Sequence, residues 1–327
     1  MSDSREAARA RACNAMDPLS QLIALTPVQG RLDFRCEFGA PWRLEELPAG
    51  VREIAFHVLL RGTAIVEGDG AAPEALRAGD VLLFPSGAGH ALHDGSGQAA
   101  RAVQRHRSSV VTIARNDGQG APAELLCGRF LLPSTSERLL RDFLPRRLVV
   151  HSQPGDADAN DFAGTRLARL IELIREESTE EGPGSAALID HLCAALFALT
   201  LRFAGESAHP PKGLLAVARK SRLQPAVQAM LDAPQRAWTL ADLARLSSMS
   251  RATLVRQFQE IVGRPPADLL TEIRMTHARR QLERTEHSIA AIAESVGYLS
   301  EAAFQRAFKR DTGMTPARWR AASLTTQ

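Results

Sequence analysis

The sequence predicts an α+β protein of two domains: a strand-rich N-terminal domain that ends in a helical pair, and an all-α C-terminal domain. The chain has 327 residues, which is enough for about two domains of the usual size. Short apolar runs broken by Gly, Pro and Asp fill residues 31–150, as in antiparallel sheets. From residue 162 onward, apolar residues recur at helical spacing instead.

The composition is that of an ordinary globular protein, with 45% apolar and 24% charged residues. No apolar run approaches the roughly 20 residues that span a bilayer, and the charged, Ala-rich opening lacks the hydrophobic region of a signal peptide. We therefore expect a cytoplasmic protein without a membrane partner, with residues 1–15 as a disordered extension. The four cysteines form no CxxC pair, so reduced thiols are expected rather than a zinc knuckle or a disulfide framework.

The strand-rich domain is expected to span residues 16–151. A helix start at Asp17 precedes apolar residues at helical spacing up to Leu25. Strands this short and this closely spaced favour a barrel or a sandwich. The runs expected to form strands are Ile54–Leu60, Thr63–Glu67, Val81–Phe84, Val110–Ala114 and Leu125–Leu132.

Turn-forming and acidic residues at 152–161 mark the end of this domain. Residues 162–177 and 185–203 carry apolar residues at i, i+3, i+4 and i+7, so residues 152–205 are expected to form a helical pair. The pair either packs back on the strands or forms a homodimer interface, and Cys193 is expected in its core or interface. A linker that contains a Pro pair, residues 206–221, follows.

The C-terminal domain, residues 222–322, contains two segments with the same plan: a short helix, a tight turn and a longer helix. In residues 239–262 and 288–312, the N-caps are Thr239 and Ser288 for the first helices, and Ser250 and Ser300 for the second. Each segment is therefore predicted to be a helix-turn-helix. The apolar positions Leu240, Leu243, Ala244, Leu254 and Phe258 correspond to Ile289, Ile292, Ala293, Phe304 and Phe308.

Pro265 can open a connecting helix that runs to about Arg284. About 20 residues at 1.5 Å each give a connector of roughly 30 Å, close to the ~34 Å between successive major-groove segments on one face of DNA. Residues 222–320 also contain 15 Lys or Arg against 10 Asp or Glu, a net charge of +5 in a chain whose total is +3. The C-terminal domain is thus suited to double-stranded DNA, and one chain can contact two helical turns.

These features resemble the AraC/XylS family of bacterial transcription regulators, and the ending AFQRAFKRDTGMTPARWR is similar to the family's C-terminal signature. The resemblance covers residues 223–322. It departs at Ser248, where the family usually has Gly at a turn position that tolerates positive φ, while Gly297 keeps this feature in the second segment. The resemblance implies promoter or operator DNA and RNA polymerase as partners, a nucleoid-associated location, and activation as the direction of control.

By the same resemblance, the second helix of each segment faces the major groove. Arg256, Gln305 and Arg306 are best suited to base edges. The other groove-facing positions are Arg251, Ala252, Val255, Glu301 and Ala302. Contacts to phosphates are expected from Arg279, Arg280, Lys309, Arg310 and the backbone N–H groups near Thr315.

Residues 79–90, GDVLLFPSGAGH, have the spacing G-x5-P-x-G-x2-H, which resembles the second motif of cupin barrels. In metal-binding cupins that His is a ligand together with an HxH pair and a Glu, but the first-motif region here has only His57. His57, His90 and His93 can still gather with Cys127 around a transition metal ion, since imidazole and thiolate suit zinc, copper or iron. The alternative is that His90 and His93 lie in a polar loop while His57 packs within a strand.

The stretch from residue 17 to His90 also resembles the cupin-bearing branch of the AraC/XylS family, which includes regulators that respond to reactive chlorine through cysteines. Cys36 lies in the most similar part and is the candidate for redox sensing. A sensing cysteine is expected to be exposed, with Arg35 or Arg43 lowering its pKa. The alternative is a small buried apolar residue, the usual role of a single Cys in a strand.

The leading hypothesis is a DNA-binding transcription regulator, not an enzyme, whose cupin-like domain senses a small ligand, a metal or an oxidant. The rival is a metal-dependent cupin enzyme with an accessory helical domain, and the incomplete metal set argues against it. A third hypothesis is a ligand-binding or scaffolding protein whose helical domain no longer binds DNA. The basic residues retained in two matched helix-turn-helix segments argue against this, and also against a merely solvated helical face.

Overall fold

The computed structural model describes residues 17–135, 137–151, 162–180, 182–207, 210–218 and 221–324. The chain divides into two compact units: Pro27–Pro211, and Met1–Thr26 together with Lys212–Gln327. We call the first the sensor unit and the second the DNA-binding unit, after the functions that the sequence leads us to expect, and describe each by itself. The expected extension (residues 1–15) and the acidic boundary segment (residues 152–161) lie outside the described residues.

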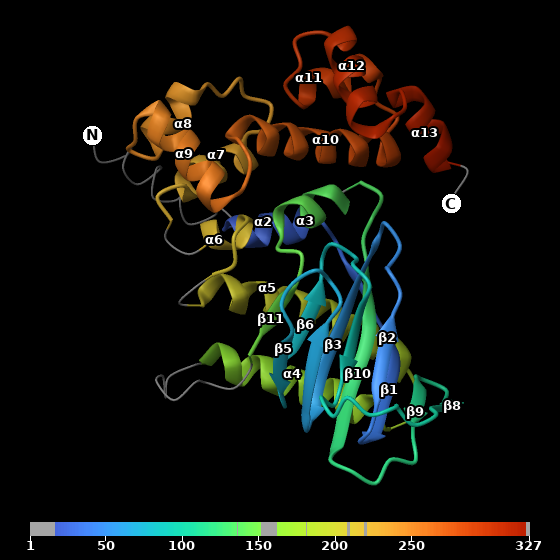
Figure 1. Ribbon diagram of the computed structural model, residues 1–327. Helices are drawn as coiled ribbons and strands as arrows, with labels where there is room; N and C mark the ends of the chain where they lie inside the picture. Colours follow the sequence, from blue (N-terminus) through green and yellow to red (C-terminus); the bar gives the residue numbers. More distant parts are fainter. Residues whose placement is uncertain are drawn as a thin grey trace, which may run out of the picture. The chain divides into compact units, whose positions relative to one another are not determined.

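The sensor unit contains two β-sheets (Figure 1). Every strand pair is antiparallel except β1 with β9. In order, the larger sheet consists of β11 (Leu148–Val150), β6 (Val81–Phe84), β3 (Glu53–Arg61), β10 (Pro122–Leu131), β1 (Gln29–Gly39), β9 (Thr112–Arg115) and β8 (Gln104–Arg107). The smaller sheet consists of β2 (Arg43–Glu46), β7 (His90–His93), β4 (Thr63–Glu67) and β5 (Glu74–Arg77). All five predicted strands are confirmed.

The core of the sensor unit lies between the inner faces of these sheets. Every second residue of β4 is buried, as expected for a strand with one face toward a core, whereas all four residues of β6 are buried. The two sheets contribute to one apolar cluster, which includes Phe38 of β1, Leu59 of β3, Val66 of β4, Phe84 of β6 and Leu92 of β7. Cys36 and Cys127 belong to the same cluster.

Among the described residues, the sensor unit also contains the helices α3 (Glu137–Phe143), α4 (Phe162–Glu177) and α5 (Ser185–Glu206). α4 and α5 pack on each other, and α5 packs on β1. Gly30 permits this close approach, because a Cβ built there would lie 2.3 Å from the Cβ of Cys193. Cys193 is fully buried, which confirms its core position.

By length and composition α5 is apolar enough to cross a membrane, and among the described residues it is the one helix that is. The sequence prediction did not identify it, because that prediction counted uninterrupted apolar runs and Asp190, His191 and Arg202 interrupt this one. Core helices of globular proteins have the same property.

The DNA-binding unit is entirely helical among the described residues (Figure 1). Both predicted helix-turn-helix segments are confirmed, together with their four N-caps. Of the ten matched apolar positions, all are buried except Leu240, which is 43% exposed, and Ile289, which is half-buried. The helices are α2 (Pro18–Leu25), α6 (Leu214–Ala218), α7 (Gln224–Asp232), α8 (Leu240–Leu246), α9 (Arg251–Ile261), α10 (Pro266–Arg284), α11 (Ile289–Ser295), α12 (Glu301–Thr312) and α13 (Pro316–Leu324).

α2 differs from the predicted domain boundaries, which assign residues 16–25 to the strand-rich domain. The Asp17 side chain caps this helix by accepting a hydrogen bond from the Ser20 N–H. Leu22 and Leu25 are buried, and the helix packs on α6 and α7 of the DNA-binding unit. The periodicity of a helix shows that it has a buried face but not which unit covers that face. The predicted linker, residues 206–221, likewise contains the short helix α6.

Candidate DNA interface and sensing site

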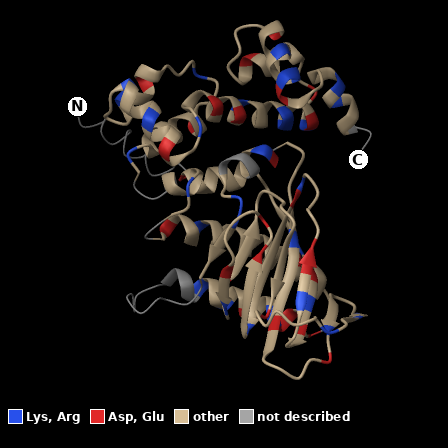
Figure 2. Ribbon diagram, viewed as in Figure 1, with Lys and Arg blue, Asp and Glu red and all other residues tan. Residues whose placement is uncertain are grey.

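The second helices of the two segments, α9 and α12, expose every position that the resemblance assigns to the major groove. Lys309, Arg310 and Thr315 are exposed as well. In Figure 2, basic residues are marked in blue along the ribbons of α12 and α13. The exposed groove-facing residues are Arg251, Ala252, Val255 and Arg256 of α9, and Glu301, Ala302, Gln305 and Arg306 of α12.

Two of the candidate base-reading side chains have partners on their own helices. Gln305 donates from Nε2 to Glu301 Oε1 at 2.8 Å, and Arg256 Nε lies 4.0 Å from Glu260 Oε1. Exposed pairs of this kind contribute little, about 0.3–0.5 kcal/mol, so DNA can displace them at small cost.

The expected phosphate contact of Arg279 is wrong, because its side chain is not accessible to DNA. Its side chain is only 2% exposed, and Nη2 lies 3.0 Å from Glu272 Oε1 and 2.7 Å from Asp311 Oδ2. Arg279 thus ties α12 to α10 through a buried ion pair. The neighbouring Arg280 is half-buried and donates from Nη1 to the Ala24 carbonyl of α2, so its expected phosphate contact is not supported either.

The two helix-turn-helix segments are held in register by α10 and by direct contacts. α10 has 19 residues, so it is about 28 Å long, as predicted for the connector. Arg274 of α10 donates to the carbonyls of Pro234 and Arg236 beside the first segment, and its guanidinium lies 5.9 Å from the ring centroid of Tyr298 in the second.

The turns of the two segments have the backbone that the resemblance implies. Gly297 has φ 88°, and a Cβ built there would lie 2.5 Å from the Gln235 carbonyl oxygen. Ser248 has φ 52°, and it is the non-glycine residue with positive φ among the described residues. Ser248 therefore keeps the left-handed backbone of the family's Gly position, and this backbone is strained for a residue with a Cβ.

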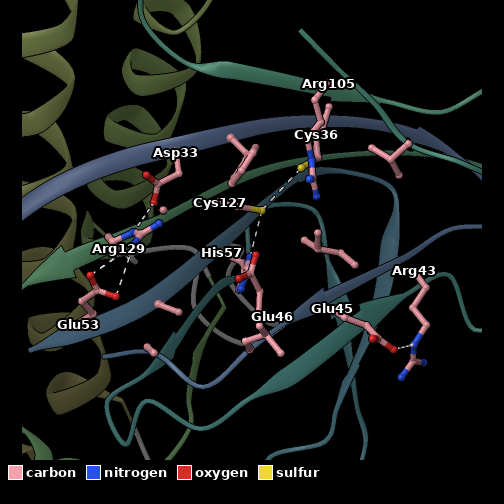
Figure 3. A pocket seen from close by; sticks show the side chains of 18 of the residues that line it. Asp33, Cys36, Arg43, Glu45, Glu46, Glu53, His57, Arg105, Cys127 and Arg129 are labelled. Carbon is pink, nitrogen blue, oxygen red and sulfur yellow. Dashed lines mark hydrogen bonds and ion pairs between the residues drawn. The ribbon is translucent and has the colours of Figure 1, made fainter. Parts of the chain in front are cut away.

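The sensor unit contains a cavity of about 710 Å³ whose wall includes Cys36, His57 and Cys127 (Figure 3). Charged side chains also line it, and the Arg129 guanidinium is paired with Asp33 and Glu53. Glu46 lines the cavity too, and burial raises the pKa of its carboxyl. The other charged lining residues include Arg43, Glu45 and Arg105.

Two thiols and two imidazoles form a continuous buried row at this cavity, which we call the thiol–imidazole row. Cys36 Sγ lies 3.9 Å from Cys127 Sγ, and Cys127 Sγ lies 3.1 Å from His57 Nδ1. His57 Nε2 lies 2.7 Å from His90 Nε2, and His90 Nδ1 lies 3.0 Å from the Ala88 carbonyl oxygen. Cys36 comes from β1, Cys127 from the neighbouring β10, His57 from β3 and His90 from β7 of the other sheet.

Burial favours the neutral forms of His57, His90 and Cys127. It places the pKa of His57 well below its ordinary value, and the charge of His90 acts in the same direction. Burial also lowers the pKa of His90. The contact with the Cys36 sulfur and burial raise the pKa of Cys127 well above its ordinary value. Near pH 7 the row therefore contains neutral imidazoles and a protonated Cys127 thiol.

The predicted metal set of His57, His90, His93 and Cys127 is not assembled. His93 lies three residues after His90 on β7, so its side chain is on the other face of the strand, where Nε2 is 3.6 Å from Glu67 Oε2. His57 directs its two ring nitrogens at two different partners and cannot bring both to one ion. Among the described residues, no group of three or more His, Cys, Asp or Glu is placed to hold a metal ion.

Of the two interpretations of Cys36, the buried one is confirmed and the exposed one is wrong, and the basic neighbours expected beside an exposed thiol pair with carboxylates instead. Cys36 is 1% exposed. Arg35 projects from the opposite face of β1 and pairs with Glu37 and Glu124, while Arg43 pairs with Glu45 and Glu67. The sequence analysis also treated Cys36 and Cys127 as separate candidates. They are 91 positions apart, and only the pairing of β1 with β10 brings them together.

Two families match the chain. Residues 17–204 match the family described as Cupin, and residues 243–322 match the Helix-turn-helix domain. The "RCS-specific HTH-type transcriptional activator RclR" of Escherichia coli (strain K12) is 30% identical over 305 residues, which cover 93% of this chain and 97% of that protein. A "Putative AraC-like transcription regulator" of Streptomyces lividans is 32% identical over 316 residues, which cover 93% of this chain and 98% of that protein.

A third relative, the "HTH-type transcriptional regulator MtrA" of Neisseria gonorrhoeae, is 28% identical over 312 residues, which cover 93% of this chain and 98% of that protein. These relatives are named as regulators and not as enzymes, and they extend over both units of the chain. The protein therefore belongs to the AraC family of DNA-binding transcription regulators, in the branch with an N-terminal cupin domain.

Proposed function

We propose that this protein is a cytoplasmic transcription activator that senses an oxidant of the reactive chlorine class at the Cys36–Cys127 pair. The observation that carries the proposal is the 3.9 Å separation of these two buried thiols in the wall of a cavity. RclR, a relative over nearly the whole chain, is named as an RCS-specific activator, which supports the same assignment. Promoter DNA and RNA polymerase are the proposed partners.

Oxidation of the pair by hypochlorous acid balances without a cofactor. One thiol attacks chlorine, so that an S–Cl bond forms and hydroxide leaves as water. The second thiol then displaces chloride as the S–S bond forms. Two thiols and one hypochlorous acid thus give one disulfide, one water, one chloride and one proton. The sulfur atoms must approach from 3.9 Å to about 2.05 Å, which requires β1 and β10 to adjust.

A homodimer is the proposed assembly, through the helical pair α4 and α5. Leu173 of α4 and Leu188 of α5 are 40% and 42% exposed, and a second copy of the same helices would cover them. Closed symmetric pairs are the commonest assemblies of soluble proteins, and two copies suit paired DNA sites.

The DNA contacts can be tested by capturing genomic fragments with the purified full-length protein at physiological salt. We expect a shared motif of about two helical turns. Arg256→Ala and Arg306→Ala are each expected to relax the preferred base at one position and to cost about 1–3 kcal/mol. Lys309→Ala is the matched control, since loss of a phosphate contact weakens all sequences alike. Capture of bulk DNA without a motif would refute sequence-specific binding.

The sensing assignment can be tested by treating the reduced protein with one equivalent of hypochlorite and mapping its disulfides by mass spectrometry. We expect a Cys36–Cys127 disulfide together with a changed affinity for the captured motif. Cys36→Ser and Cys127→Ser should both abolish the response, whereas Cys193→Ala, which removes a buried thiol outside the row, should retain it. A response that survives in Cys36→Ser and Cys127→Ser rules out this site.

A further inference from the structure

We infer that His57 is the general base that accepts the Cys127 proton as Cys127 attacks the oxidant, while His90 takes up the resulting positive charge beside Asp69. This inference rests on the proposed function, because it concerns how the same thiol pair is oxidised. It assigns the attacking thiol to Cys127 and the resolving thiol to Cys36.

The hydrogen bonds of the row determine where its protons lie. A carbonyl oxygen can only accept, so His90 must carry its proton on Nδ1, 3.0 Å from the Ala88 oxygen. A neutral His90 then has a lone pair on Nε2 and accepts from His57 Nε2–H at 2.7 Å. A neutral His57 in turn has a lone pair on Nδ1, 3.1 Å from Cys127 Sγ. The Cys127 S–H therefore donates to His57.

Cys36 has a different place in this arrangement. Its sulfur contacts the Cys127 sulfur, and the Cys127 proton is already directed at His57. The Cys36 S–H is thus free to donate to Cys127 Sγ and to stabilise negative charge that develops there. Of the two thiols, Cys127 is the one with a base within hydrogen-bond distance among the described residues, which makes it the attacking thiol.

Cys127 needs a base because its protonated thiol is otherwise unreactive toward the oxidant. The thiolate is the nucleophile, and the raised pKa of Cys127 leaves almost none of it near pH 7. Arg35 and Arg43 pair with carboxylates elsewhere, so neither compensates a thiolate at Cys127. Arg105 also lines the cavity, where its guanidinium lies 5.6 Å from the Phe34 ring centroid. A base that takes the proton during attack avoids the formation of a free buried thiolate.

Asp69 provides the place where positive charge is tolerated. Its side chain is 1% exposed, and Oδ1 is held by Arg147 and by the Ala71 N–H. Oδ2 is buried and has no hydrogen-bond partner among the described residues. The charge of Asp69 favours the protonated form of His90. Phe84 stacks on the His90 ring with centroids 3.5 Å apart, which fixes the ring orientation.

The proton transfer balances within the row. The Cys127 proton moves to His57 Nδ1, and the proton on His57 Nε2 moves to His90 Nε2, so His57 ends neutral and His90 ends as imidazolium. The S–Cl bond forms as the O–Cl bond of hypochlorous acid breaks. The leaving hydroxide then takes back one proton through the same two rings and becomes water.

Other charged groups act on Cys127 from every side of the cavity. Glu46 on β2 and Asp33 on β1 both oppose a thiolate. Arg129 on β10 is paired with Asp33 and Glu53, so its charge is largely compensated. Arg105 on β8 lines the cavity as well. Cys127 and His57 are themselves in contact with Cys36 and His90. Of these groups, only His57 has a lone pair directed at the Cys127 proton.

The test is the rate of Cys36–Cys127 disulfide formation in the full-length protein with monochloramine, a slower oxidant of the same class. His57→Asn keeps a hydrogen-bond acceptor but cannot take up a proton. We expect His57→Asn and His90→Asn to slow the reaction about 100-fold at pH 7, in line with general-base contributions. His93→Asn, on the other face of β7, should react like the wild type.

The pH profile separates a base from a merely structural residue. The wild-type rate should change less than about tenfold between pH 6.5 and 8.5, whereas the His57→Asn rate should rise about tenfold per pH unit with the thiolate fraction. Free imidazole should also restore at least about tenfold of the rate in His57→Ala, because the open cavity adjoins the vacated position.

These experiments distinguish a failure of the proposed oxidant sensing from a failure of the proposed base role of His57. If the wild type forms no Cys36–Cys127 disulfide, the proposed function itself fails. If it forms the disulfide but His57→Asn reacts within twofold of the wild type with the same pH profile, the oxidant assignment stands and the base assignment is wrong. A third outcome is that His57→Asn forms the disulfide slowly, that imidazole does not restore the rate in His57→Ala, and that the rate depends on pH as in the wild type. In that case the role of His57 is structural.

Discussion

Replacing Ser248 by Gly is expected to stabilise the DNA-binding unit by about 0.75 kcal/mol, the difference between the middle values of two opposing costs. Ser248 holds φ at 52° in the turn between α8 and α9, and left-handed backbone costs a residue with a Cβ roughly 1–2 kcal/mol. Glycine removes that cost, but it also gives the unfolded chain more conformational freedom, which lowers the free energy of unfolding by about 0.5–1 kcal/mol. The Ser248 side chain is exposed, and its carbonyl bond from Arg222 is retained in the glycine variant.

The measurement is urea unfolding of the full-length protein followed by hydrogen exchange of peptides within residues 239–262, which reports on this unit alone. The mirror variant Gly297→Ser should lose at least roughly 2 kcal/mol, since it adds the same backbone cost and places a Cβ 2.5 Å from the Gln235 carbonyl oxygen. If Ser248→Gly leaves the midpoint unchanged or lowers it, the backbone at Ser248 is not strained and the reasoning is refuted.

Three further predictions concern charged and titratable side chains. Arg279→Ala should lower the free energy of unfolding of the DNA-binding unit by about 3–5 kcal/mol in urea melts, because it leaves two carboxylates buried together. Arg284→Ala, at an exposed position, should change that free energy by less than about 0.5 kcal/mol. Similar losses for both variants would contradict the buried ion pair. The pKa of His57 lies well below 6.5 in the folded protein. As the pH falls below about 6.5, the unfolded chain therefore binds a proton at His57 that the folded chain does not bind. The free energy of unfolding of the sensor unit should then fall by up to about 1.4 kcal/mol per pH unit. His57→Asn should lessen that slope in melts between pH 7.5 and 5, and an unchanged slope would show that His57 titrates normally. Arg274→Ala should weaken binding to a two-turn DNA site about tenfold, or roughly 1.4 kcal/mol, while a one-turn site shows no loss; equal loss on both sites would mean that Arg274 does not couple the segments.

Features set by short stretches of sequence were predictable. The N-caps Thr239, Ser250, Ser288 and Ser300 each lie next to the turn they close, so local chemistry was enough to locate four helices. The unusual turn at Ser248 was also foreseeable, because two copies of one motif allow a position in one to be compared with its counterpart in the other.

Features set by long-range packing were not predictable. Nothing near Cys36 indicates that its sulfur meets Cys127, since the contact depends on the register of β1 with β10. The burial of Arg279 was missed for a related reason. Helical periodicity assigns a charged residue to the outer face, and only the position of Asp311 on α12 shows that α10 has partners on that side.

α2 supports a last prediction about which unit it stabilises. Leu22 and Leu25 are buried on the DNA-binding unit, Gln21 donates to Asp232 of α7, and Arg280 of α10 donates to the Ala24 carbonyl. Leu22→Ala should therefore lower the free energy of unfolding of the DNA-binding unit by about 2–5 kcal/mol and leave that of the sensor unit unchanged. Hydrogen exchange in urea distinguishes the units, with peptides from β3 and β10 reporting on the sensor unit and peptides from α9 and α12 on the other.

The same measurement bears on how a signal can pass along the chain. β1, which carries Cys36, begins at Gln29, three residues after Thr26 ends the cap of α2. If the proposed Cys36–Cys127 disulfide moves β1, we expect the displacement to act on α2, because the connection between them is too short to absorb much of it. If Leu22→Ala instead destabilises the sensor unit, α2 belongs with the strands and this covalent route between the thiol pair and the DNA-binding helices does not exist.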